Sequence, residues 1–151
     1  MSRAATRSVS ARAIDGPKLS SKRRRRLMHI SKFKVSLEAT GRLRVLRQRA
    51  GLTPNLLCRM AMSTSFEMGK VGPAPDVEEG QEFNAYTLFG GDQPIYTTLL
   101  RMVETEDGED VSDRELIRRL RAHIDRGLTA LSVRVKSPGD AARLLAVGHE
   151  G

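Results

Sequence analysis

The sequence feature that most constrains the fold is the stretch from Gly51 to Asn55. Gly51 suits the left-handed backbone conformation that commonly ends a helix. Thr53 can accept a hydrogen bond from the free amides of a following helix, and Pro54 fits the first helical position, where its missing N–H costs nothing. The stretch therefore predicts a tight turn inside a helix-turn-helix pair at residues 35–65.

Apolar residues recur at helical spacing on both sides of this turn. Phe33 to Ser36 alternates apolar and polar residues, which predicts a short strand before the first helix, and Ser36 can cap that helix. The stripe of the first helix is Ala39, Leu43, Leu46 and Ala50, and that of the second is Leu56, Leu57, Met60 and Ala61.

The second half of the chain also has mainly helical patterns. Asp92 and Pro94 open a third helix, and Ser112 with Glu115 forms a capping box that opens a fourth. Gly127 can end that fourth helix. The expected inner face of the third helix is Ile95, Leu99, Met102 and Val103, and that of the fourth is Leu116, Ile117, Leu120 and Ile124, with Arg114, Arg118 and Arg121 on its other side.

Other segments are less regular. Residues 71–84 read as a loop that includes an acidic run, and Tyr86 to Phe89 favours a short strand or an extended segment. Residues 128–135 are ambiguous between helix and strand, and Ser137 starts a last short helix. The fold class is therefore mainly α, a small helical domain with one or two short strands.

The first 27 residues differ from the rest. They are rich in Ser, Ala and Arg, contain the block from Lys22 to Arg26 and have no periodic apolar face, so we expect a disordered basic tail. The basic block could hold nucleic acid phosphates, the segment could be a transit peptide, or it could be an upstream segment that is not made at all, with Met28 as the start. Residues 28–151 are expected to form a single domain.

Charge is strongly segregated along the chain. Residues 31–60 hold seven Lys or Arg and one Glu, whereas residues 61–113 hold two basic and twelve acidic residues. The formal net charge of +8 for the whole chain comes from the tail, so it does not by itself indicate DNA binding. The informative feature is a basic helical pair followed by an acidic middle.

The sequence lacks the usual signatures of catalysis. We find no glycine-rich phosphate loop, metal-ligand cluster or nucleophile–base pair, and therefore expect no catalytic residue, metal or cofactor. The single cysteine, Cys58, reads as a small buried hydrophobe, and His123 reads as a surface or interface residue. No apolar run is long enough to span a membrane, and we expect a cytoplasmic protein.

Three stretches resemble the DndE family of the bacterial DNA phosphorothioation (DNA sulfur modification) system. They are Gly51 to Arg59, Glu79 to Gly90, which is the most specific, and Arg121 to Gly127. The resemblance runs from about Ile30 over roughly four-fifths of the chain, and the basic tail has no counterpart in the family core.

The resemblance implies a small helical protein that assembles as a homotetramer and binds duplex DNA, with a preference for nicks. It also implies partners that include an iron–sulfur sulfurtransferase and an ATPase, and no chemistry in the small subunit itself. We predict backbone binding through phosphate neutralisation. The candidate DNA-binding residues are Lys32, Lys34, Arg42, Arg44, Arg47, Arg49 and Arg59.

Other interpretations remain open at this point. A ribbon-helix-helix transcriptional regulator would pair Phe33 to Ser36 across a dimer and read bases with that strand. An enzyme would combine the acidic residues Glu79 and Glu82 with His123. A scaffold would use the charge segregation for protein contacts, and the basic helix face would be merely solvated if it had no partner.

Overall fold

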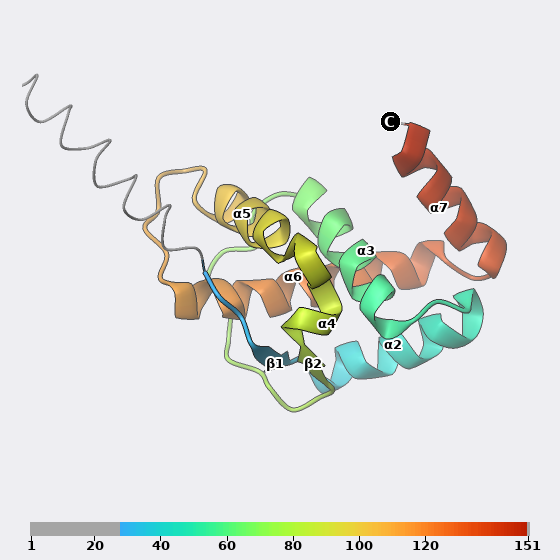
Figure 1. Ribbon diagram of the computed structural model, residues 1–151. Coiled ribbons are helices and arrows are strands. Elements are labelled where there is room, and N and C mark those ends of the chain that lie inside the picture. Colours follow the sequence, from blue (N-terminus) through green and yellow to red (C-terminus); the bar gives the residue numbers. More distant parts are fainter. Residues whose placement is uncertain (1–27, 151) are drawn as a thin grey trace, which may run out of the picture.

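The fold is a set of helices packed around one long helix, with a two-stranded sheet at its edge (Figure 1). The computed structural model describes residues 28–150, with side chains described up to residue 146; the predicted basic tail lies outside these residues. In chain order the elements are β1 Lys32–Lys34, α2 Leu37–Ala50, α3 Pro54–Glu67, β2 Glu82–Asn84, α4 Ala85–Phe89, the short 3-10 helix η1 Gly90–Asp92, α5 Gln93–Glu104, α6 Asp113–Arg134 and α7 Pro138–Glu150.

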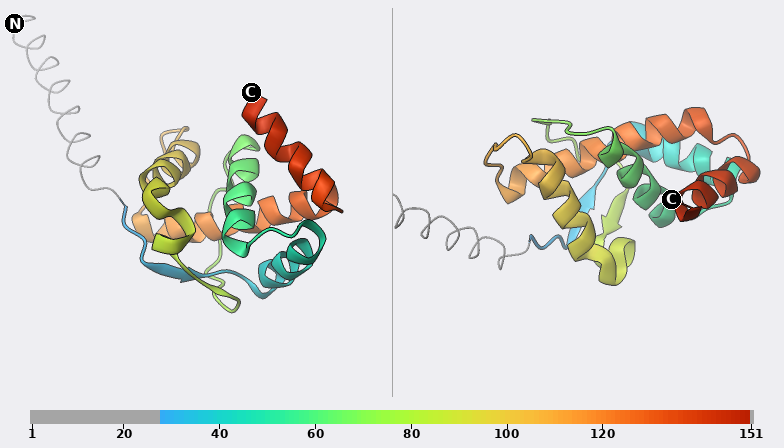
Figure 2. Two further views of the ribbon diagram at one scale, coloured as in Figure 1. Left: turned by 45° about the vertical axis from the view of Figure 1, so that its right-hand side comes forward. Right: turned by 90° about the horizontal axis from the view of Figure 1, so that it is seen from above.

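The long helix α6 organises the molecule. It crosses α3 near Gly127, where an added Cβ would meet the carbonyl oxygen of Ala61 at 1.9 Å. Only glycine lets the two helix backbones approach this closely. The loop between α5 and α6 lies at the N-terminal end of α6, whereas α2 and α7 lie toward its other end (Figure 2).

The helix-turn-helix pair is confirmed. Gly51 has φ of 72° and its N–H donates to the carbonyl of Arg47, which ends α2. The Thr53 side chain accepts a hydrogen bond from the Leu56 amide, and Pro54 is the first residue of α3. The local chemistry of five residues thus fixed where one helix stops and the next begins.

The two strands form an antiparallel ladder within the chain. Phe33 pairs with Phe83 in register, and their rings stack with centroids 6.1 Å apart on the inner face. Because side chains alternate along a strand, Lys32 and Lys34 lie on the outer face. The strand that a ribbon-helix-helix protein would pair with a second copy is here paired with β2 of its own chain.

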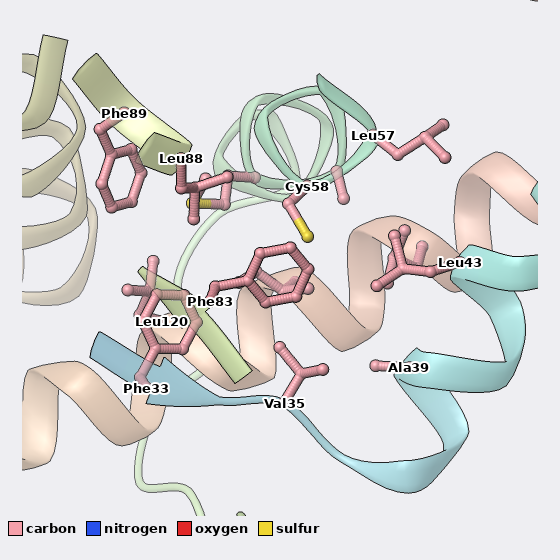
Figure 3. Close-up of a cluster of buried hydrophobic side chains, with 14 of the residues drawn as sticks. Phe33, Val35, Ala39, Leu43, Leu57, Cys58, Phe83, Leu88, Phe89 and Leu120 are labelled. Carbon is pink, nitrogen blue, oxygen red and sulfur yellow. The ribbon is translucent and has the colours of Figure 1, made fainter. Parts of the chain in front are cut away.

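The core joins these elements through aliphatic side chains and a few aromatic rings. Leu43 of α2, Leu57 of α3 and Leu120 of α6 are fully buried. Cys58 points into this cluster between Phe83 and the helices (Figure 3). The interpretation of Cys58 as a buried hydrophobe is therefore confirmed.

Some predicted elements were wrong. Tyr86 to Phe89 is the helix α4 instead of a strand, because the Asn84 side chain accepts hydrogen bonds from the Tyr86 and Thr87 amides and caps it. The strand is instead Glu82–Asn84, inside the predicted loop. Gly127 does not end α6, which continues to Arg134, so the ambiguous segment 128–135 is helix up to that residue.

Helix α5 buries the face opposite to the one that the sequence predicted. Ile95, Leu99 and Met102 are exposed, whereas Thr97 and Glu104 are buried. The apolar stripe faces outward because Glu104 on the other side of the helix is bound to polar groups of α6 and of the loop after α3. Within residues 28–150 no helix combines the length and the apolar character that crossing a membrane requires.

Candidate nucleic-acid interface

The lysines of β1 are the first part of the predicted basic surface. Lys32 and Lys34 are both exposed on the outer face of the two-stranded sheet. Their cross-strand neighbours on β2 are Asn84 and Glu82, respectively. Opposite charges at paired positions attract, so Glu82 offsets part of the charge of Lys34. Lys32 has an uncharged neighbour, Asn84, and its charge is not offset across the strands.

Helix α2 presents its arginines on two different sides. Its buried face, with Leu43 and Leu46, lies between them. Arg44 and Arg47 are exposed on one side. Neither forms an ion pair with any side chain that the structure describes, so both are available to an anionic partner.

Arg42 and Arg49 lie on the other side of α2, toward α6. They line a shallow groove of about 570 Å³ that is completed by Val133 of α6 and by Lys136, which follows the end of that helix. The Arg49 guanidinium donates to the carbonyl oxygen of Ser132 at 3.2 Å, and the Lys136 ammonium donates to the same oxygen at 2.9 Å. Arg42 is 3.6 Å from the exposed carboxylate of Glu38.

Arg59 of α3 differs from the other six candidates. It is half-buried, and its Nε atom is buried without a hydrogen-bond partner among the described residues. A guanidinium held against the protein reaches an external phosphate less easily than an exposed one. The structure therefore brings Arg42 and Arg49 together, places Arg44 and Arg47 on the opposite side of α2, and leaves Arg59 apart.

Three arginines of α6, Arg118, Arg119 and Arg121, are paired with carboxylates of the same chain. Arg121 donates to Asp76 at 3.1 Å and to Glu78 at 2.5 Å, and Arg118 lies 3.8 Å from Asp76. Arg119 is buried and binds three carboxylates, those of Glu104, Glu109 and Glu115. Much of the acidic middle thus neutralises α6 of its own chain and leaves the exposed arginines of α2 unpaired.

Comparisons with known proteins decide the family. The family model described as DNA sulphur modification protein DndE matches residues 32–138. The chain belongs to the DndE family. It is therefore a protein of the DNA phosphorothioation pathway.

Solved DndE structures have the same fold. The crystal structure of DndE from Escherichia coli B7A, involved in DNA phosphorothioation modification, is 24% identical with a TM-score of 0.57, covering 69% of this chain and 98% of that one. The crystal structure of a DndE G21/24K mutant involved in DNA phosphorothioation is 21% identical with a TM-score of 0.59, covering 69% and 99%. No curated protein sequence gives a significant match.

The most specific DndE motif, Glu79 to Gly90, holds the sheet against the start of α2. A Cβ on Gly80 would meet the Ser36 carbonyl oxygen and the Thr40 hydroxyl at 2.3 Å each. The Gly80 amide donates to the Val35 carbonyl at 2.7 Å, and the Gln81 amide donates to the Thr40 hydroxyl at 2.8 Å. These contacts are structural, so this motif specifies the fold.

The third DndE motif, Arg121 to Gly127, has a similar structural role. Asp125 accepts a hydrogen bond from the Ser36 hydroxyl at 2.8 Å, which ties α6 to the first turn of α2. Arg126 donates to the hydroxyl and the carbonyl of Ser65, and to the carbonyl of Gly69. The candidate DNA-binding residues lie outside this motif.

His123 is buried, so its interpretation as a surface or interface residue was wrong. Its Nδ1 lies 2.7 Å from the Ser65 hydroxyl and its Nε2 lies 2.7 Å from the Glu104 carboxylate. All three side chains have no exposed surface. Burial lowers the pKa of His123 against the opposing effect of Glu104, which favours the neutral ring.

This polar cluster stabilises the fold and contains no accessible nucleophile. Burial alone would raise the pKa of Glu104, but hydrogen bonds from the Val71 amide, His123 and the Gly72 amide outweigh it and lower the pKa. Because both ring nitrogens of His123 are already engaged, the enzyme alternative cannot combine this histidine with Glu79 and Glu82. Among the described residues, no group of three or more acidic, His or Cys side chains is placed to hold a metal ion.

Cys58 does not have the environment of a reactive thiol. Burial raises its pKa to about 12. The thiolate is the nucleophilic form, so this side chain stays protonated near neutral pH. Its place in the structure is that of a packing residue.

Sequence reasoning missed Lys136. It lies just beyond the end of α6, and nothing in its neighbourhood along the chain links it to α2. A basic residue near a helix C-terminus can be expected to bind the last carbonyls. Its proximity to Arg49, however, depends on how α2 and α6 pack.

Proposed function

We propose that this DndE-family protein is a non-catalytic, DNA-binding component of the phosphorothioation complex. It contacts the backbone of duplex DNA, with a preference for nicks, and works beside an iron–sulfur sulfurtransferase and an ATPase in the cytoplasm. The observation that carries this proposal is the contrast in pairing. Arg44 and Arg47 are exposed without carboxylate partners among the described side chains, whereas Arg118, Arg119 and Arg121 of α6 bind carboxylates of the same chain.

Exposed arginines favour phosphate over bases as the target. A guanidinium binds a phosphate with two parallel hydrogen bonds, and each neutralised phosphate releases condensed counterions. Lys32 adds a further cation from β1. Backbone contacts position a protein on DNA without reading its sequence, which suits a protein that acts at nicks.

The test is binding of the full chain to nicked and intact duplexes of one sequence across a salt series. We expect the Arg44→Gln/Arg47→Gln variant to bind more weakly, with a salt slope reduced by about one per lost phosphate contact. Arg114→Gln is the matched control for each single change, Arg44→Gln or Arg47→Gln, because Arg114 is exposed on α6 and lies about 27 Å along that helix from Ser132. Equal losses in the control and the single α2 variants would argue against a site on α2.

The basic tail, residues 1–27, needs its own control in this experiment. A chain whose Lys22 to Arg26 block is replaced by Gln tests whether binding comes from the tail. Loss of all binding in that chain, together with full binding by the Arg44→Gln/Arg47→Gln variant, would contradict the proposed site. A scaffold role would then be the better explanation.

We also propose that the protein forms a homotetramer, as the family resemblance implies. The exposed stripe of α5 supports self-association, since Ile95 and Met102 are 57% and 61% exposed and a row of apolar residues at the surface commonly marks an interface. Sedimentation of Ile95→Asn/Met102→Asn should show smaller particles than the parent chain. Thr98→Asn, an exposed change on the same helix, should leave the assembly unchanged.

A further inference from the structure

The groove between α2 and α6 gathers cations from two elements that are far apart in the sequence. Arg42 and Arg49 come from α2, and Lys136 follows the end of α6. The Arg49 guanidinium and the Lys136 ammonium both bond the Ser132 carbonyl oxygen, at 3.2 and 2.9 Å, so the two charged groups are neighbours. Neighbouring like charges repel, and the carbonyl near the C-terminal end of α6 offsets part of this repulsion.

Most hydrogen-bond donors of this pair are not used by the protein. A guanidinium has five N–H donors and an ammonium has three, and the Ser132 carbonyl takes one from each. No carboxylate of the described side chains lies within ion-pair distance of either group. Two acids are close by: Glu38 lines the same groove and faces Arg42 at 3.6 Å, and Asp140 accepts the backbone N–H of Lys136 at 2.8 Å and pairs with Arg143.

We propose that this groove binds the terminal phosphate of a DNA strand end, and that this contact gives the preference for nicks. The inference rests on the proposed function, since it assigns the nick-recognition part of the DNA-binding surface. A terminal phosphate monoester carries a charge of roughly −1.5 to −2 and three acceptor oxygens. It therefore matches the Arg49–Lys136 pair better than a singly charged phosphodiester does.

The shape of the site supports a strand end over a continuous backbone. Arg44 and Arg47 are exposed on the opposite side of α2, where an unbroken strand can run past them. The Arg49–Lys136 pair lies in a groove that Val45 and Val133 flank. These apolar side chains can contact the sugar of the terminal nucleotide while the cations hold its phosphate.

The experiment compares the full chain on duplexes of one sequence that are intact, nicked with a 5′-phosphate, nicked with a 3′-phosphate, or nicked with hydroxyl groups on both ends. We expect one phosphorylated nick to bind about tenfold more tightly than the hydroxyl nick, because one additional charged contact is worth about that factor. The Arg49→Gln/Lys136→Gln variant should lose this ratio. The Arg44→Gln/Arg47→Gln variant should weaken binding to all four duplexes and leave the affinity ratio between phosphorylated and hydroxyl nicks unchanged.

The possible failures are distinguishable. Equal affinity of the parent chain for phosphorylated and hydroxyl nicks overturns the inference, and leaves the proposed function intact if all duplexes are bound. Absence of binding to every duplex overturns the proposed function itself. Should the double variant unfold, the single change Lys136→Gln, at an exposed residue outside any helix, must still reduce the ratio for the inference to hold.

Discussion

The arginines of α2 and of α6 look alike in the sequence and differ completely in the structure. Arg119 of α6 is 1% exposed and binds the carboxylates of Glu104, Glu109 and Glu115 at 3.1, 2.8 and 3.0 Å. Arg44 and Arg47 of α2 are exposed and have no carboxylate partner among the described side chains. Basic residues at helical spacing therefore indicate nothing about function until their acidic neighbours are known.

The position of the acidic middle makes this difference. Acidic residues of the loop between α5 and α6 and of the segment before β2 form ion pairs with α6, and none of the described ones forms an ion pair with an arginine of α2. Arg119 and Arg121 thus connect loops to the core, and their charge is cancelled locally. The charge of α2 remains directed at the solvent, where it can act on a polyanion.

The largest expected effect is the loss of the buried arginine. Arg119→Met leaves Glu104 without its guanidinium partner in a site with no exposed surface, and breaking a buried pair in this way typically costs about 3–5 kcal/mol. Urea unfolding followed by circular dichroism measures this loss. Arg114→Gln, on the same helix, should change the unfolding free energy by less than about 0.5 kcal/mol.

If Arg119→Met changed the unfolding free energy as little as Arg114→Gln does, the contrast between the buried α6 arginine and the exposed α2 arginines would be contradicted. It would mean that the acidic residues around Arg119 find other partners or take up protons without cost. The DNA affinity of folded Arg119→Met should equal that of the parent chain, because Arg119 is inaccessible.

The second prediction concerns acid. Folding lowers the pKa of His123 from 6.5, so the unfolded chain binds a proton first and stability falls as the pH drops below 6.5. The hydrogen bonds of Arg119 and Lys70 lower the pKa of Glu109 from 4.5 to about 2. Stability from this carboxylate is present above pH 4.5 and disappears as the pH falls toward 2.

Thermal unfolding from pH 7.5 to about 2 measures the loss of stability from His123 and from Glu109. His123→Gln should flatten the loss of stability that begins below pH 6.5, and Arg119→Met should weaken the loss of stability below pH 4.5. A parent chain whose midpoint is constant from pH 7 to 5 would show that His123 titrates as an exposed histidine does.

A smaller effect is expected at Arg121. It is largely buried, but its partners Asp76 and Glu78 are about half exposed, so water can take over part of the interaction when the arginine is lost. Arg121→Gln should cost about 1–2 kcal/mol of unfolding free energy, between the values for buried and surface pairs. Limited proteolysis should show earlier cleavage in residues 73–79, since the arginine holds this loop to α6.

Local sequence signals predicted the helices well. The turn at Gly51 to Pro54 and the capping box at Ser112 depend only on residues that are adjacent in the chain, and both form as expected. Asn84 acts through the same kind of local capping contact. That signal was overlooked because the β-favouring residues after it suggested a strand.

Features that depend on packing could not be read in this way. Gly127 was predicted to end a helix because glycine often follows the last helical residue. In the structure it lies inside α6, where the absence of a side chain lets the backbone of α3 approach at Ala61. The stripe of α5 looked like a core face, but the buried side of that helix carries Glu104 for the polar cluster with His123. The groove joining Arg49 to Lys136 likewise exists only once α2 meets α6.

The smallest expected change in unfolding free energy, that of Arg44→Gln, also distinguishes the exposed α2 arginines most clearly from the paired arginines of α6. Arg44 and Arg47 lie three positions apart on α2, and like charges at this spacing destabilise a helix by a few tenths of a kcal/mol. Arg44→Gln should therefore leave the unfolding free energy unchanged or raise it by about 0.3 kcal/mol, while DNA affinity falls. A residue that lowers stability and is needed for binding is maintained for its function, whereas a loss of more than 1 kcal/mol would show that Arg44 supports the fold as the α6 arginines do.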